Sequence, residues 1–120
     1  MIRRLIPVTL LVLALTPLQA LAYPRNVERW RVPIRTELKR QGVWSAFIED
    51  KALHIIQSES SGIPTAGKGR SCQGLFQFQR GWSRGKDRRL SGYWSVTRFV
   101  TAYRQGGLRS IKRHWRATYY

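Results

Sequence analysis

The sequence predicts a small, mainly α-helical domain that follows an N-terminal export signal. Three observations predict this fold class. Apolar residues recur at spacings of three and four over residues 48–56 and 96–103, which is the period of an amphipathic helix. No stretch shows the clear alternation of apolar and polar residues that marks a half-buried strand. The length of 120 residues allows one domain with a modest core once the signal is removed.

The N-terminal segment, residues 1–22, has the pattern of a secretory signal peptide. Two arginines start it, an apolar run covers residues 5–18, and a small-x-small pattern, Ala-Leu-Ala, ends it. The apolar run is short for a membrane span, which needs ~20 residues. We therefore expect cleavage, export across the inner membrane, and a mature domain of residues 23–120 in the periplasm or cell envelope. An uncleaved signal anchor is the alternative.

Positive charge dominates the composition. The chain has 22 Lys and Arg against six Asp and Glu, and the mature part keeps 20 of the basic residues, a balance of +14. This balance predicts an anionic partner or surface, with cell-wall polymer and anionic lipid as candidates. Nucleic acid is not expected, because the chain carries an export signal and no recognisable nucleic-acid motif. A GC-rich genome is the other explanation, since arginine outnumbers lysine.

Cysteine and histidine usage predicts neither a disulfide nor a metal site. Cys72 is the only cysteine, so no intramolecular disulfide can form, and no spaced His/Cys set accompanies it. We expect Cys72 to be a small, partly buried packing residue and His54 and His114 to be packing or surface residues. The sequence therefore predicts no metal and no cofactor.

A proline, a glycine and a serine mark the boundaries of the first two predicted helices. Residues 23–31 are expected to form an irregular arm or short helix. Pro33 suits the first turn of a helix, so a helix is expected over residues 34–41, with Gly42 as its stop. Ser45 is the predicted N-cap of the next helix, which carries two carboxylates in its first turns.

This second helix ends on a carboxylate, Glu59. Glu59 continues the apolar face that is formed, at spacings of three and four, by Ile48, Ala52, Ile55 and Ile56. A typical helix would place another apolar residue there, so the surroundings of the carboxyl are expected to be semi-apolar. A carboxyl at the apolar end of a helix is one way to build a general acid with a raised pKa. A solvated glutamate at a frayed helix end is the alternative.

Loops and one further helix pair are predicted for the rest of the chain. Residues 60–72 and 80–92 are expected to be glycine-containing loops, with residues 74–79 as a short helix or turn between them. Ser95 is the predicted N-cap of a helix whose apolar stripe reaches Tyr103. That helix ends at a pair of glycines, and a final short helix places three apolar residues on one face, Leu108, Ile111 and Trp115.

Three segments form an ordered set of motifs. They are Glu59-Ser60-Ser61-Gly62, Gly74-Leu75-Phe76-Gln77, and Ala102-Tyr103 with Gly106-Gly107 and Trp115. This set resembles the soluble lytic transglycosylase family of the lysozyme-like superfamily, which is close to goose-type lysozyme. That family has a Glu-Ser pair at a helix end, a Gly-Leu-(Met/Phe)-Gln motif, and an Ala-Tyr-Asn-Ala-Gly motif with a downstream Trp. The resemblance covers residues 52–115 and departs at Arg104, where the family has Asn.

The resemblance implies a small lysozyme-like helical domain and a peptidoglycan lytic transglycosylase. Such an enzyme cleaves the β-1,4 bond between N-acetylmuramic acid and N-acetylglucosamine and closes a 1,6-anhydro ring. Glu59 would act as general acid and then as general base. Peptidoglycan glycan strands are the implied partner, and envelope-spanning secretion, conjugation or phage machinery is a further candidate. A lysozyme-type muramidase and a non-catalytic cationic wall-binding module are the alternative functions.

Other residues receive supporting roles. The predicted substrate-binding residues are Ser61, which hydrogen-bonds Glu59 or the substrate, Gln77, which lines the cleft, and Tyr103, whose hydroxyl reaches Glu59. A helix-end serine, a turn glutamine and a core aromatic are the respective alternatives. Three further aromatic residues are candidates for stacking on sugar rings, with ordinary packing as the alternative: Trp82, Tyr93 and Trp94.

The positions of the carboxylates favour a mechanism with one acid. A glycosidase with two carboxylates holds them about 5–5.5 Å or 6.5–9.5 Å apart. Glu49 and Asp50 lie ten and nine residues before Glu59 on the same helix, which at ~1.5 Å per residue is about 13–15 Å. Asp87 lies in a basic run and is expected to pair with arginine. The two remaining carboxylates are in the N-terminal part, Glu28 and Glu37.

Overall fold

The structure, a computed structural model, describes residues 23–112. The predicted signal peptide and two predicted residues, His114 and Trp115, lie outside this range. Within it the protein is mainly α-helical, as predicted. Its elements in chain order are α2 (Arg25–Glu28), α3 (Arg31–Arg40), α4 (Ala46–Ser60), β1 (Cys72–Gln73), β2 (Phe78–Gln79), the 3-10 turn η3 (Arg80–Trp82) and α5 (Gly92–Lys112).

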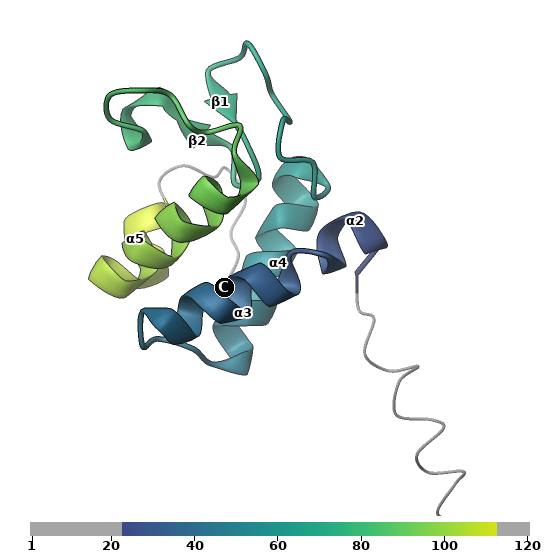
Figure 1. The fold of residues 1–120 in the computed structure, drawn as a ribbon, viewed down its shortest axis with the longest axis vertical. Helices are drawn as coiled ribbons and strands as arrows, with labels where there is room; N and C mark the ends of the chain where they lie inside the picture. Colours follow the sequence, from purple (N-terminus) through teal and green to yellow (C-terminus); the bar gives the residue numbers. More distant parts are fainter. Residues whose placement is uncertain (1–22, 113–120) are drawn as a thin grey trace, which may run out of the picture.

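The helices pack around α3 and α4, and the small sheet lies at one end of them. Helix α3 packs against both α4 and α5, and α2 packs against α4. The two strands lie beyond the end of α4 and near the start of α5 (Figure 1). The loop that follows Glu59 therefore connects the end of α4 to strand β1.

The starts of α3 and α4 follow from local sequence. Helix α3 begins at Arg31, three residues before its predicted start, and Pro33 stands in its first turn. Gly42 follows its end with φ 75°, a left-handed conformation that favours glycine. Ser45 caps α4 as predicted, because its side chain accepts a hydrogen bond from the backbone N–H of Ile48 at 3.2 Å.

The start of α5 corrects the prediction that Ser95 is its N-cap. The helix begins at Gly92, and the Oγ of Ser91 accepts a hydrogen bond from the N–H of Trp94 at 3.3 Å. Ser95 is fully buried inside the helix and donates to the carbonyl of Arg89 at 3.2 Å. A Cβ on Gly92 would lie 2.1 Å from the ring of Trp30. That glycine therefore serves a tertiary contact, which the sequence pattern alone does not reveal.

The predicted break at the glycine pair is confirmed. Gly107 has φ 66° and ψ −171°, which is not helical, so α5 consists of two helical segments joined by a kink. The second segment continues to Lys112 and places Ile111 in the core and Leu108 half-buried against it.

The core joins the hairpin to α5 through stacked aromatic rings. The ring of Phe76 stacks on that of Phe99 with centroids 4.4 Å apart, and Phe78 stacks on Phe76 at 5.7 Å. Ile55 and Ile56 of α4 are fully buried in the same cluster. The segment 74–79 thus contributes Phe76 and Phe78 to the core.

Residues 74–77 of that segment form the turn between two short strands, which agrees with the predicted turn. The strands are antiparallel, with Cys72 opposite Gln79 and Gln73 opposite Phe78. Each strand has only two residues, which is too short for an alternating pattern to appear in the sequence. Cys72 is partly buried, as predicted, and is a free thiol.

A buried carboxylate ties the start of α4 to α3. Glu49 is only 2% exposed. Its two oxygens accept hydrogen bonds from Arg35 at 2.6 and 2.7 Å, from Arg31 at 2.9 Å, and from the indole N–H of Trp44 at 2.9 Å. Because every partner comes from α3 or from the connection that follows it, these bonds fix the α3–α4 angle.

We expect acid to weaken the fold between pH 5 and pH 2. The hydrogen bonds of Arg35 foremost lower the pKa of Glu49 from 4.5 to about 2, and those of Arg89 lower the pKa of Asp87 from 3.8 to about 2. A carboxyl with a lower pKa in the folded state stabilises fully above its unfolded pKa, and this stabilisation is lost as the pH falls through the folded value. Urea midpoints at pH 6, 4 and 2 should therefore decrease in that order. A midpoint that does not change with pH would show that these ion pairs do not stabilise the fold.

Candidate active site

Glu59 lies in the last turn of α4 and is half-buried. The residues three and four positions before it, Ile56 and Ile55, are fully buried. The apolar stripe of α4 therefore leads to this carboxyl, as predicted. The helix ends immediately afterwards, because Ser61 adopts the left-handed conformation at φ 53° and ψ 28°.

The turn after Glu59 is fixed by hydrogen bonds. The Oγ of Ser60 donates to the carbonyl of Ile56 at 3.2 Å and accepts from the N–H of Gly62 at 3.3 Å. The carbonyl of Gly62 in turn accepts from the indole N–H of Trp30 at 2.9 Å and from Arg29 at 3.2 Å. The junction of α2 and α3 thus holds the backbone next to Glu59 in one conformation.

Gly62→Ala should destabilise the protein by about 3 kcal/mol or more. Gly62 has φ 81°, and a Cβ there would lie 2.0 Å from the backbone oxygen of Asn26, which cannot move without shifting α2. Gly69→Ala is the matched control, because Gly69 has φ 80° and a Cβ added to it would meet no atom within 4 Å. It should cost only about 1 kcal/mol. Equal urea midpoints for the two variants would contradict the close packing of Gly62 against α2.

The loop that follows is fastened to the hairpin. The carbonyl of Ala66 accepts from the N–H of Gly74 at 2.9 Å and from the side-chain amide of Gln77 at 3.0 Å. The same amide donates to the carbonyl of Gly74 at 2.9 Å. Gln77 therefore holds the turn, which is the alternative role expected for it, and it also brings the second motif against the loop after Glu59. Its contact with a substrate stays a prediction.

Arg89 braces the hairpin from the other side. It is 3% exposed and donates to the carbonyls of Ser71 at 2.8 Å and Phe78 at 2.9 Å. Asp87 holds it through two side-chain hydrogen bonds of 2.9 and 3.0 Å, which confirms that Asp87 pairs with arginine. Sequence reasoning missed this role, because Arg89 looks like any other member of a basic loop.

Ser61 and Tyr103 have fewer contacts. Ser61 is exposed, and Tyr103 lies on α5, half-buried against the core. The roles predicted for Ser61 and Tyr103 toward Glu59 and a substrate stay predictions. Arg104, where the resemblance departs, points to the end of α3 and donates to the side-chain oxygen of Gln41 at 2.9 Å.

Five carboxylates of residues 23–112 form ion pairs with arginine. Their partners are Arg31 for Glu28 and Asp50, Arg40 for Glu37, Arg31 and Arg35 for Glu49, and Arg80 and Arg89 for Asp87. Hydrogen bonds from Arg40 likewise lower the pKa of Glu37. Carboxyls with lowered pKa values are poor proton donors at neutral pH. Glu37, Glu49 and Asp87 are thus poor candidates for a general acid.

Residues 23–112 contain no group of three His, Cys, Asp or Glu side chains that could hold a metal ion. Across the same range, no helix has the length and apolar character to cross a membrane. His54 is exposed on α4, in agreement with a surface role. Comparison with known proteins finds no matching family model, no matching curated protein and no matching solved structure.

Proposed function

We propose that this protein is a peptidoglycan lytic transglycosylase with a small lysozyme-like domain and that Glu59 is its general acid and base. The observation that carries the proposal is the placement of Glu59. It lies half-buried in the last turn of α4, where the buried face of that helix meets a turn held by the hydrogen bond from Trp30 to the carbonyl of Gly62. The three motifs of the resemblance support the reaction class.

The position of Glu59 is not explained by helix stability. The C-terminal end of a helix is the negative end of its dipole, where a cation is favoured and a carboxylate is not. The adjacent backbone is held by buried groups, with Ser60 7% and Trp30 7% exposed. A costly position on a rigid support is typical of a functional residue, because catalysis needs groups held in fixed geometry.

The proposed reaction uses one carboxyl twice. Protonated Glu59 donates its proton to the glycosidic oxygen as the bond from that oxygen to C1 of the muramoyl residue breaks. The resulting carboxylate takes the proton of the muramoyl 6-hydroxyl while O6 bonds to C1, which closes the anhydro ring. Glu59 ends protonated as it began, and no water is consumed.

The separation of Glu49 from Glu59 favours this route over a hydrolase that would use these two carboxylates. Glu49 lies ten residues before Glu59 on α4, about 15 Å away, and its oxygens are occupied by arginine and tryptophan donors. Such a hydrolase would need a partner within about 10 Å. The proposed setting is the periplasm or cell envelope, where glycan strands are the substrate and an envelope-spanning machine is a proposed partner.

The positive charge favours a second candidate function, binding to the wall without catalysis. The mature balance of +14 favours adhesion to an anionic polymer. Incubating the chain without residues 1–22 with purified peptidoglycan separates the two functions. The proposed enzyme should release soluble glycan fragments steadily over time. Binding that salt reverses, with no fragments released, would support the binding module instead.

A further inference from the structure

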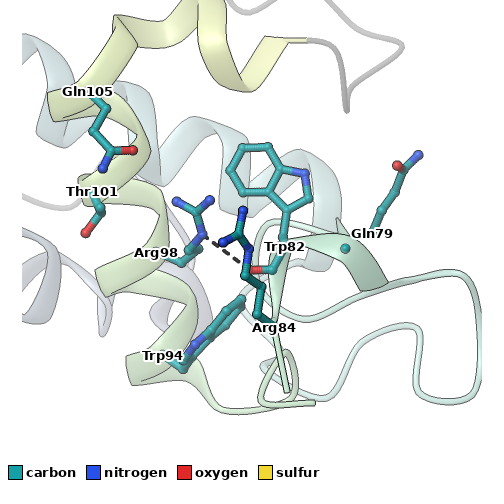
Figure 2. A pocket seen from close by; sticks show the side chains of 8 residues that line it. Gln79, Trp82, Arg84, Trp94, Arg98, Thr101 and Gln105 are labelled. Carbon is teal, nitrogen blue, oxygen red and sulfur yellow. Dashed lines mark hydrogen bonds between the residues drawn. The ribbon is translucent and has the colours of Figure 1, made fainter. Parts of the chain in front are cut away.

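A pocket of about 630 Å³ lies between η3 and α5, apart from the predicted site residues. Figure 2 shows its side chains: Trp82 and Arg84 come from η3 and the loop after it, and Trp94 and Arg98 come from the first turns of α5. None of Glu59, Ser61, Gln77 and Tyr103 is among its lining residues.

Two tryptophans give this pocket aromatic walls that the core holds in place. The ring of Trp82 stacks on buried Phe78, with centroids 4.9 Å apart and planes at 12°. Trp94 meets the same Phe78 edge-on, at 6.2 Å and 89°. Both indoles are half-buried. Fixed aromatic faces suit flat apolar surfaces such as the faces of sugar rings, because little side-chain entropy is lost on binding.

Two arginines bring positive charge to the same place. The guanidinium of Arg98 lies 4.5 Å from the ring centroid of Trp82, and its Nε donates to the Trp82 carbonyl at 3.3 Å. The guanidinium of Arg84 lies beside it (Figure 2). Burial and the charge of Arg84 lower the pKa of Arg98. No Asp or Glu is among the residues that line this pocket, so an anion bound there would relieve the repulsion.

We propose that this pocket binds a carboxylate-bearing saccharide, with a sugar ring against Trp94 and the carboxylate between Arg84 and Arg98. The planar forks of the two arginines match a carboxylate. Thr101 and Gln105, on the next turns of α5, offer hydrogen-bonding groups for sugar hydroxyls. The proposal takes from the proposed function only the class of polymer, a wall glycan whose muramic acid residues carry lactyl groups.

A neighbouring pocket extends this surface. It has a volume of about 390 Å³, shares Thr101, and is lined by Arg40 and Arg104. A second cationic pocket beside the first suits a polymer whose acidic groups repeat along its length. The ligand is therefore a strand rather than a single acidic sugar.

The test measures equilibrium binding of glycan strands whose stem peptides have been removed by an amidase, which leaves free lactyl carboxylates. The protein carries Glu59→Gln so that strands stay uncut. Strands with amidated carboxylates should bind at least about tenfold more weakly, and so should the variant Arg84→Gln/Arg98→Gln toward untreated strands. The control variant Arg25→Gln/Arg70→Gln loses the same charge at two exposed sites outside the pocket and should change affinity less than about threefold.

Three outcomes would overturn the proposal. One is equal weakening by the two double variants, which would mean unspecific charge attraction. Another is unchanged affinity for amidated strands, a comparison that needs no variant in the pocket and so does not depend on folding. The third is arginine-dependent binding of single-stranded DNA with no binding of glycan. All binding is measured with the Glu59→Gln variant. The outcome of the binding test is therefore independent of whether Glu59 is catalytic.

Discussion

Glu59→Gln should lower the rate of peptidoglycan cleavage by about 10²–10⁴-fold, the contribution typical of a general acid or base. Glutamine keeps the size of the side chain at the end of α4 but cannot deliver a proton to the glycosidic oxygen. The rate of fragment release from purified wall measures the loss. The urea midpoint of the variant should stay close to that of the wild type, because hydrogen bonds of this turn are made by Ser60 and Gly62, which the substitution leaves unchanged.

The matched control for this variant is Asp50→Asn, which makes the same chemical change on the same helix. Asp50 is exposed, and its side chain contacts Tyr23 at the far end of α4. We expect its cleavage rate to equal that of the wild type. If Glu59→Gln and Asp50→Asn were equally active, Glu59 could not be the general acid.

The second large effect concerns stability. Glu49→Ala should reduce the free energy of unfolding by about 3 kcal/mol, because breaking a buried ion pair leaves its partners unsatisfied. Arg31, Arg35 and the indole N–H of Trp44 all donate to this one carboxylate. Urea unfolding at pH 7 measures the loss.

Asp50→Ala controls for the loss of a carboxylate on α4. The Asp50 side chain is 58% exposed and lies 3.9 Å from Arg31, so its removal should cost less than about 1 kcal/mol. A similar cost for the two alanine variants would show that the Glu49 cluster does not stabilise the α3–α4 contact. A loss for Glu49→Ala that is equal at pH 7 and pH 2 would also contradict it. At pH 2 about half of the native Glu49 carboxyl is protonated, and most of the stabilisation that comes from its lowered pKa is lost.

Features that depend on neighbours in the sequence were predictable. The cap at Ser45, the stop at Gly42 and the kink at Gly107 each follow from the conformational preference of one residue. The apolar stripe of α4 also predicted where Glu59 lies, because helix periodicity fixes which residues share a face.

Features that depend on distant contacts were not predictable. Ser91 rather than Ser95 caps α5, and the next residue, Gly92, lies against the ring of Trp30 from a distant part of the chain. The burial of Arg89 depends on carbonyls that only the folded hairpin brings together. The clamp on Gly62 likewise joins residues 32 positions apart. Sequence periodicity carries no information on such pairs, so the support of the candidate site was visible only in the structure.

The most direct test of the catalytic role of Glu59 is mass spectrometry of the fragments released from purified peptidoglycan in ¹⁸O-labelled water. The wild-type protein should produce 1,6-anhydromuramoyl ends that carry no label, and Glu59→Gln should produce almost none. Reducing muramoyl ends that carry ¹⁸O would show that water attacks C1 and would contradict the proposed lyase. Anhydro ends released equally by Glu59→Gln would contradict the role of Glu59.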